Sequence, residues 1–201
     1  MLNDSFITED SVSVVSKEEL LMSKLLRFYS DPMNLRVFVS IAEQGTAISL
    51  RLLDWFSTNY SKNNQVYINK IDVHSDYKNV LDGYKKKCFD PFCRKRRIFI
   101  YSDTEKVRDF KKKIELKYKY VDNYEEYICH PNGIVTTIGQ LNFFKWCMER
   151  NIISYIIQNI QTIEKSMSDI ACIKKSSKNQ KRKKSINNAH KTVMTFTLKF
   201  N

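Results

Sequence analysis

The chain of 201 residues is 42% hydrophobic, so it is long enough for one domain with a real core, with or without tails. Its four glycines and three prolines are too few for the tight turns of an all-β sandwich or barrel, and no run of about 18 apolar residues predicts a transmembrane helix. The formal net charge of +12 favours a polyanionic partner: nucleic acid, an anionic membrane surface or an acidic protein.

Hydrophobic periodicity predicts an α+β fold, with four or five helices packed on a small mixed or antiparallel sheet. The predicted elements are, in chain order, a helix over 17–29, a strand over 35–41, a helix over 47–62, a strand over 65–73, a helix over about 76–87, strands over 97–102 and 113–121, and helices from 137 to about 150 and over 152–167. Ser16 and Glu19 form a capping-box pattern before the first helix, and Asp31-Pro32 ends that helix. The run LRVFVSI (35–41) leaves a short helix open as the alternative to a strand.

Local signals refine several of these elements. Thr46 is the expected cap of the second helix, and Ser75 or Asp76 is the expected cap of the third. Residues 113–121 alternate strictly between apolar and polar, which indicates a half-solvated strand. The stretch GQLNFFKW (139–146) follows the helical period, so we expect it in the core, with a partner surface as the alternative.

These elements predict three segments. Residues 1–15 are polar and form a flexible leader, whose acidic residues are unlike a secretory signal. Residues 16–170 form a single α+β domain. Residues 171–201 form a basic, largely disordered tail, whose last stretch, TVMTFTLKF, alternates and could form a short strand.

The positive charge lies in two blocks. Residues 85–119 hold fourteen Lys or Arg against five Asp or Glu, and residues 170–201 hold nine Lys or Arg and no acidic residue. Each block therefore carries +9, and the rest of the chain is net acidic. Blocks of this kind bind polyanions by releasing condensed counterions.

A nucleic-acid interface is predicted where basic residues alternate with phenylalanines, because such a surface can contact phosphates and stack on bases. The candidate residues in the central belt KKKCFDPFCRKRR are Lys85, Lys86, Lys87, Phe89, Phe92, Arg94, Lys95, Arg96 and Arg97. Those in the tail, within KKSSKNQKRKK, are Lys181, Arg182, Lys183 and Lys184. The alternatives are a solvated loop whose phenylalanines are core residues, and a solubilising or nuclear-localisation tail.

Metal binding and catalysis have weaker signals. Cys88, Cys93, Cys129 and His130 could supply four zinc ligands, but their spacing is loose, and the five scattered cysteines are typical of reduced intracellular thiols. His74 lies between Asp72 and Asp76, a pattern that polar residues at the end of a strand also explain. No phosphate-binding glycine loop is present. We therefore expect neither an enzyme nor a bound cofactor or metal.

Three segments, AISLRLLDWFSTNY (47–60), FDPFCRKRRI (89–98) and TTIGQLNFFKW (136–146), resemble an uncharacterised protein family of nucleocytoplasmic large DNA viruses, the giant viruses and their relatives. The resemblance spans about residues 35–170. It implies no catalytic residues. It implies a viral protein in the cytoplasmic virus factory or nucleus of the host cell, or in the virion, tied to genome handling, late gene expression or virion structure.

The sequence therefore predicts a non-enzymatic viral protein that binds nucleic acid, DNA rather than RNA, with other viral proteins as further partners and neither a membrane nor a small-molecule substrate. The alternative is a structural or scaffold protein of the virion or of a viral transcription complex, acting through protein–protein contacts. An enzyme would require His74 or His130 to meet carboxylates or thiols in a cleft.

Overall fold

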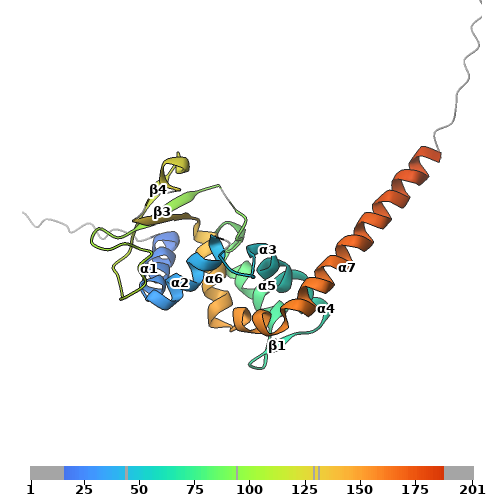
Figure 1. Cartoon of the computed structure of the whole chain (residues 1–201), viewed down its shortest axis with the longest axis horizontal. Coiled ribbons are helices and arrows are strands. Elements are labelled where there is room, and N and C mark those ends of the chain that lie inside the picture. Colours follow the sequence, from blue (N-terminus) through green and yellow to red (C-terminus); the bar gives the residue numbers. More distant parts are fainter. Residues whose placement is uncertain (1–15, 44, 94, 129, 131, 188–201) are drawn as a thin grey trace, which may run out of the picture.

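The computed structural model describes residues 16–187 with the exception of 44, 94, 129 and 131. Its helices and turns are α1 (Lys17–Tyr29), α2 (Pro32–Ala42), α3 (Leu50–Trp55), the π-helical turn η1 (Phe56–Tyr60), α4 (Ser61–Asn63), α5 (Val73–Tyr84), the 3-10 turns η2 (Lys86–Cys88) and η3 (Tyr124–Tyr127), α6 (Ile138–Glu149) and α7 (Ile152–Asn187). Its strands are β1 (Tyr67–Ile68), β2 (Ile71–Asp72), β3 (Arg97–Tyr101), β4 (Lys117–Val121) and β5 (Gly133–Thr136). Helices beside two small antiparallel sheets confirm the predicted α+β class (Figure 1).

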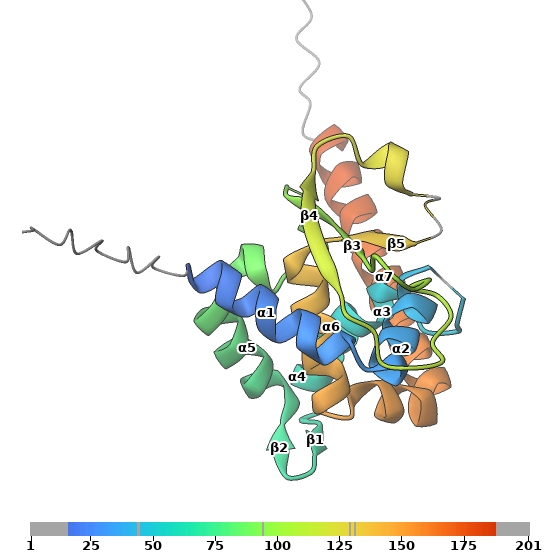
Figure 2. The ribbon, with the colours of Figure 1, turned by 90° about the vertical axis from the view of Figure 1, so that its left-hand side faces the viewer.

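The larger sheet has the order β4-β3-β5, with both neighbours antiparallel to β3. Ile98 lies opposite Tyr120 on one side and Thr136 on the other, so these three side chains share one face. That face is buried at Ile98 and Ile100. Figure 2 shows this sheet beside α1 and α6. A hydrogen bond from Tyr120 to Glu18 brings the end of β4 near the start of α1.

Helix α6 is the centre of the core. Phe143, Phe144 and Trp146 are buried there, and the Tyr29 hydroxyl donates a buried 2.7 Å hydrogen bond to the carbonyl of Leu141. A helix that is apolar on most sides has to be surrounded by other elements. The core interpretation of residues 139–146 is therefore confirmed, and their interpretation as an exposed partner surface is wrong.

The first two helices test the capping signals. The capping box of Ser16 and Glu19 is present, and α1 has the predicted bounds. The strand predicted over 35–41 is wrong and the alternative, a helix, is confirmed, because these residues lie in α2. Asp31 ends α1 and also accepts from the backbone N–H of Asn34, with Pro32 in the first turn, so the signal that stops one helix starts the next.

Other boundaries also differ from the prediction. Ser49, not Thr46, caps α3, and the predicted helix over 47–62 contains the π-helical turn. The strand expected over 65–73 is a short hairpin, and Asp72 caps α5 in place of Ser75 or Asp76. Strand β5 was not expected, and only 117–121 of the strand over 113–121 pairs with β3.

Helix α7 differs most from expectation. Its backbone is helical to Asn187, where the sequence predicts a disordered tail from residue 171, and the helix extends away from the body (Figure 1). No glycine or proline interrupts 152–187, and isoleucine, lysine and serine are the most frequent residues there. Asn159 alone has non-helical backbone angles, at φ −121° and ψ 17°. The leader over 1–15 and the stretch TVMTFTLKF lie outside the described residues.

A search of the described part of the chain for a helix with the length and apolar character of a membrane span finds none.

Candidate nucleic-acid interface

The central basic belt forms a loop, residues 85–97, between α5 and β3; we call it the basic loop. Its middle is fixed in the core by Phe89, which is fully buried. The Phe89 ring lies 5.7 Å from those of Tyr77 and Phe143 and 5.8 Å from that of Trp146, measured between centroids. The prediction that Phe89 stacks on bases is therefore wrong, because other core residues cover its ring. Phe92 remains 43% exposed.

Two residues of α6 hold the backbone of the basic loop. The buried amide of Asn142 donates to the carbonyl of Cys88 at 3.0 Å. Gly139 approaches the loop so closely that a Cβ atom there would lie 2.7 Å from the carbonyl oxygen of Asp90. Buried hydrogen bonds and close backbone contact restrict local opening. Residues 88–90 of the basic loop are thus anchored to the core.

Glu18, in the first turn of α1, lies among the cations of the basic loop. Its carboxylate lies 3.1 Å from Lys87 Nζ and 2.7 Å from an Arg96 guanidinium nitrogen, and it accepts a 2.8 Å hydrogen bond from the Tyr120 hydroxyl. The hydrogen bond from Tyr120, followed by Lys87 and Arg96, lowers the pKa of Glu18. Burial, together with the bond to Glu18, raises the pKa of Tyr120 to about 12.

Consecutive arginines at the end of the basic loop pair with tyrosines from two other elements. The guanidinium carbon of Arg96 lies 4.3 Å from the ring centroid of Tyr120 on β4, and that of Arg97 lies 3.2 Å from Tyr124 on η3. A guanidinium over an aromatic face is held by the ring quadrupole and stays available to other partners at its edges.

Two hollows lie on either side of Lys95 and Arg96. The first, here called the tyrosine hollow, has a volume of about 440 Å³ and is lined by Lys95, Arg96, Arg97, Tyr120, Val121, Asp122 and Tyr124. The second, the cysteine hollow, measures about 270 Å³ and is lined by Glu18, Lys87, Cys88, Cys93, Lys95, Arg96, Thr137 and Ile138. Because Lys95 and Arg96 line both, they form the ridge between them. Among the residues that the structure describes, each hollow is lined by three cations and one carboxylate.

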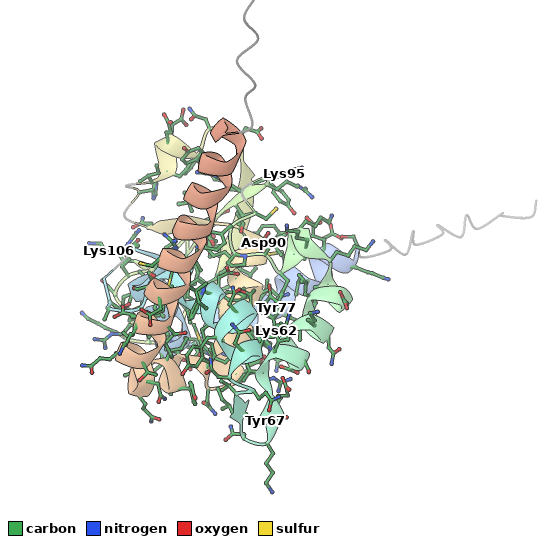
Figure 3. All side chains as sticks on the ribbon, turned by 90° about the vertical axis from the view of Figure 1, so that its right-hand side faces the viewer. Lys62, Tyr67, Tyr77, Asp90, Lys95 and Lys106 are labelled. Carbon is green, nitrogen blue, oxygen red and sulfur yellow. The ribbon has the colours of Figure 1, made fainter. Side chains whose placement is uncertain are left out.

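The other predicted contact residues are spread out. Lys85 and Lys86 are exposed on the basic loop, Lys86 at 3.8 Å from Asp90, whereas Arg94 lies outside the described residues. The tail candidates, Lys181, Arg182, Lys183 and Lys184, lie on the projecting part of α7, far from the basic loop in Figure 1. Figure 3 shows Lys95 near the edge of the molecule, with Asp90 and Tyr77 nearer its middle. The structure therefore brings together the central candidates but not the tail.

Sequence reasoning missed Glu18, Tyr120 and Tyr124 as members of this site. The alternation over 113–121 places Tyr120 on a strand, but it gives no sign that the ring meets Arg96. Glu18 is 78 positions from its partner Arg96, and no local pattern reports such a distant pairing.

The candidate metal and catalytic residues have other roles in the part of the chain that is described. No group of three or more His, Cys, Asp or Glu residues there could hold a metal ion, and Cys129 lies outside that part. His130 packs against Phe99 at 5.2 Å between ring centroids. Asp72 caps α5, and Asp76 binds Trp146 and Arg150, each at 2.7 Å. Burial raises the pKa of the Cys88 thiol, which disfavours a reactive thiolate.

Comparison with known proteins identifies relatives of the whole chain. The model of a family of unknown function, DUF7197, matches residues 3–114 and 108–195. An uncharacterised protein of Acanthamoeba polyphaga mimivirus is 31% identical over 197 residues, which cover 94% of this chain and 68% of the relative. No solved structure matches. These findings confirm the resemblance to an uncharacterised protein family of giant viruses.

Proposed function

We propose that this chain, which belongs to the family of unknown function DUF7197, is a non-enzymatic protein that binds nucleic acid in a nucleocytoplasmic large DNA virus. The basic loop contacts the phosphate backbone, and the basic part of α7 adds affinity that does not depend on sequence. The observation that carries the proposal is the ridge of Lys95 and Arg96 between two hollows that are each net positive. The expected setting is genome handling or late gene expression, on DNA rather than RNA, in the virus factory, nucleus or virion.

The anchoring of residues 88–90 to the core supports this role. Phosphate contacts gain affinity when their cations are already held in place, because less side-chain and backbone freedom is lost on binding. Phe89 and Asn142 provide that support from the core side. Glu18 offsets part of the charge of Lys87 and Arg96, whereas Lys85 and Lys95 have no ion pair with any residue that the structure describes.

The basic part of α7 supports the second element of the proposal. Residues 174–184 hold seven Lys or Arg and no acidic residue, and their backbone is helical. A helix rises 1.5 Å per residue, so the 17 residues from 171 to 187 extend over roughly 25 Å. A cationic helix of that length is suited to contact several successive phosphates of one nucleic-acid molecule.

The experiment is an anisotropy titration of the full chain against labelled DNA and RNA from about 50 to 200 mM salt. We expect Lys95→Gln with Arg96→Gln to weaken binding about tenfold or more and to reduce the slope of log K against log salt by about 1.4 to 1.8. The matched control is Lys62→Gln with Lys106→Gln, which removes two exposed cations from other parts of the surface (Figure 3). Affinity that stays flat with salt, or equal losses for the two pairs, would contradict the proposal.

A second candidate is a structural or scaffold role through protein–protein contacts. It is favoured by an apolar groove of about 520 Å³ between α2 and α7, whose lining includes Met33, Val37, Ile153, Ile157 and Ile160. Ile157 is 59% exposed there, unlike the buried Ile156 and Ile163 of the same helix. Exposed apolar surface of this kind marks contact sites. If neither DNA nor RNA binds at low salt, this second role becomes the leading one.

A further inference from the structure

We infer that the tyrosine hollow takes an unpaired nucleobase, so that the ligand of the basic loop is single-stranded nucleic acid rather than a duplex. This inference rests on the proposed function, because it names the class of nucleic acid that the same surface binds.

The first support is the pair of cation–tyrosine contacts in the hollow. Arg97 lies over Tyr124 and Arg96 lies over Tyr120, at 3.2 and 4.3 Å from the ring centroids. Tyr120 is nevertheless 43% exposed. Unpaired bases stack on tyrosine rings and on guanidinium planes, whereas the faces of paired bases are covered inside a duplex. Aromatic rings beside cations are therefore more useful to a single-stranded ligand.

The second support is the position of the hollow at the end of an edge strand. In the order β4-β3-β5, β4 is an edge strand of the sheet that the described residues form. Arg97 pairs with Val121, and Ile98 pairs with Tyr120, so Arg97 and Tyr120 start from opposite faces of the sheet and still line one hollow. The hollow therefore bends around the end of β4. A bent, recessed surface fits a flexible strand better than a straight, stiff duplex.

The third support is that the two hollows beside the ridge of Lys95 and Arg96 differ in the side chains that line them. On one side the tyrosine hollow offers rings, and on the other the cysteine hollow offers Lys87 beside the shared Lys95 and Arg96. A volume of about 440 Å³ is within the range of pockets that hold small ligands, roughly 300–1,000 Å³. A strand crossing the ridge would place a base in the first hollow and its neighbouring phosphate at the second.

The test compares the full chain with labelled oligo-dT, oligo-U and a mixed-sequence duplex of equal length at about 100 mM salt. We expect either single strand to bind about tenfold more tightly than the duplex. We expect Tyr124→Ala to weaken single-strand binding about tenfold, Tyr124→Phe to restore most of it, and duplex binding to change little. Tyr67→Ala is the control, because Tyr67 is 61% exposed on the distant β1 hairpin (Figure 3).

The outcomes distinguish a failure of the proposed function from a failure of the single-strand inference alone. If no nucleic acid binds at low salt, the proposed function fails and this inference fails with it. If the duplex binds as tightly as the single strands, or if Tyr124→Ala weakens both equally, the inference is overturned while the proposed function stands. Tryptophan at this position, Tyr124→Trp, adds a direct readout, since its fluorescence should be quenched by single strands when bases stack on it and unchanged when they do not.

Discussion

The carboxylate of Glu18 lies 2.7 Å from the guanidinium of Arg96, although 78 positions separate the two residues. The same carboxylate lies 3.1 Å from Lys87, so one acidic side chain lies between two cations of the proposed phosphate-binding surface. The lowered pKa of Glu18 keeps it charged throughout the neutral range. Under the proposed function, Glu18 would therefore compete with a phosphate at these two cations, which it also pairs with.

The first prediction follows from that competition. Glu18→Gln should tighten the binding of single-stranded DNA by roughly threefold to tenfold at low salt, because it removes a negative charge within a few ångströms of the bound phosphate. Anisotropy titrations measure the change. Glu164→Gln, an exposed site on α7, removes the same charge elsewhere and should have a smaller effect. Weaker binding by Glu18→Gln would mean that orientation of Lys87 and Arg96 outweighs competition.

The second prediction concerns the buried support of the basic loop. Asn142→Ala should lower the free energy of unfolding by about 1–3 kcal/mol, because the carbonyl of Cys88 would be left buried without its 3.0 Å hydrogen bond. Urea unfolding followed by circular dichroism gives this value. Asn63→Ala, at an exposed position in α4, should change stability by less than about 0.5 kcal/mol. Equal effects of the two changes would show that the bond to Cys88 does not stabilise the fold.

The third prediction uses two glycines that both lie in helices. A Cβ atom at Gly139 would lie 2.7 Å from the carbonyl oxygen of Asp90, whereas one at Gly83 meets nothing within 4 Å. Gly139→Ala should therefore destabilise the protein by about 1–3 kcal/mol through a backbone clash. Gly83→Ala should stabilise it by up to about 1 kcal/mol, because alanine restricts the unfolded chain and favours the helix. Melting temperatures that move in the same direction for both would contradict the proposed contact.

The elements that could be predicted from sequence are those with a local start signal. The capping box of Ser16 and Glu19 defines α1, and Thr137 begins α6 as expected. The β-branched residues of α2 favour a strand locally and leave a short helix as the alternative, and Asp31 and Pro32 decide in favour of the helix. Strand β5 could not be found, since four residues acquire their structure from pairing with β3.

The candidate site shows the same division between local and tertiary information. The cations of the basic loop are visible in the sequence, and charge alone identifies them as candidates. The burial of Phe89 depends on how α6 packs against the basic loop, and the position of Tyr124 beside Arg97 depends on how η3 packs there. Residue type therefore identifies the candidate cations, and only the fold reveals which aromatic rings lie beside them and which are buried.

The fourth prediction concerns Asp54, a partly buried carboxyl group in α3. Burial, together with the nearby charge of Asp90, raises its pKa above the ordinary value of 3.8. A carboxyl group with a raised pKa favours the folded state only when it is protonated, so its contribution is present below the ordinary pKa and is lost as the pH rises through the folded-state pKa. Asp54→Asn should therefore stabilise the protein near neutral pH, and this gain should shrink toward zero near about pH 3.

Urea unfolding at several pH values measures that gain, with Asp169→Asn, an exposed change in α7, as the control. A second readout comes from Tyr77, whose pKa is raised to about 12 by burial and then by Asp54. Removing the charge of Asp54 should lower the pKa of Tyr77, which the ultraviolet absorbance of tyrosinate reports. A stability gain that is the same at acid and neutral pH would contradict the electrostatic explanation, because burial acts against Asp54 only when the carboxyl group is ionised.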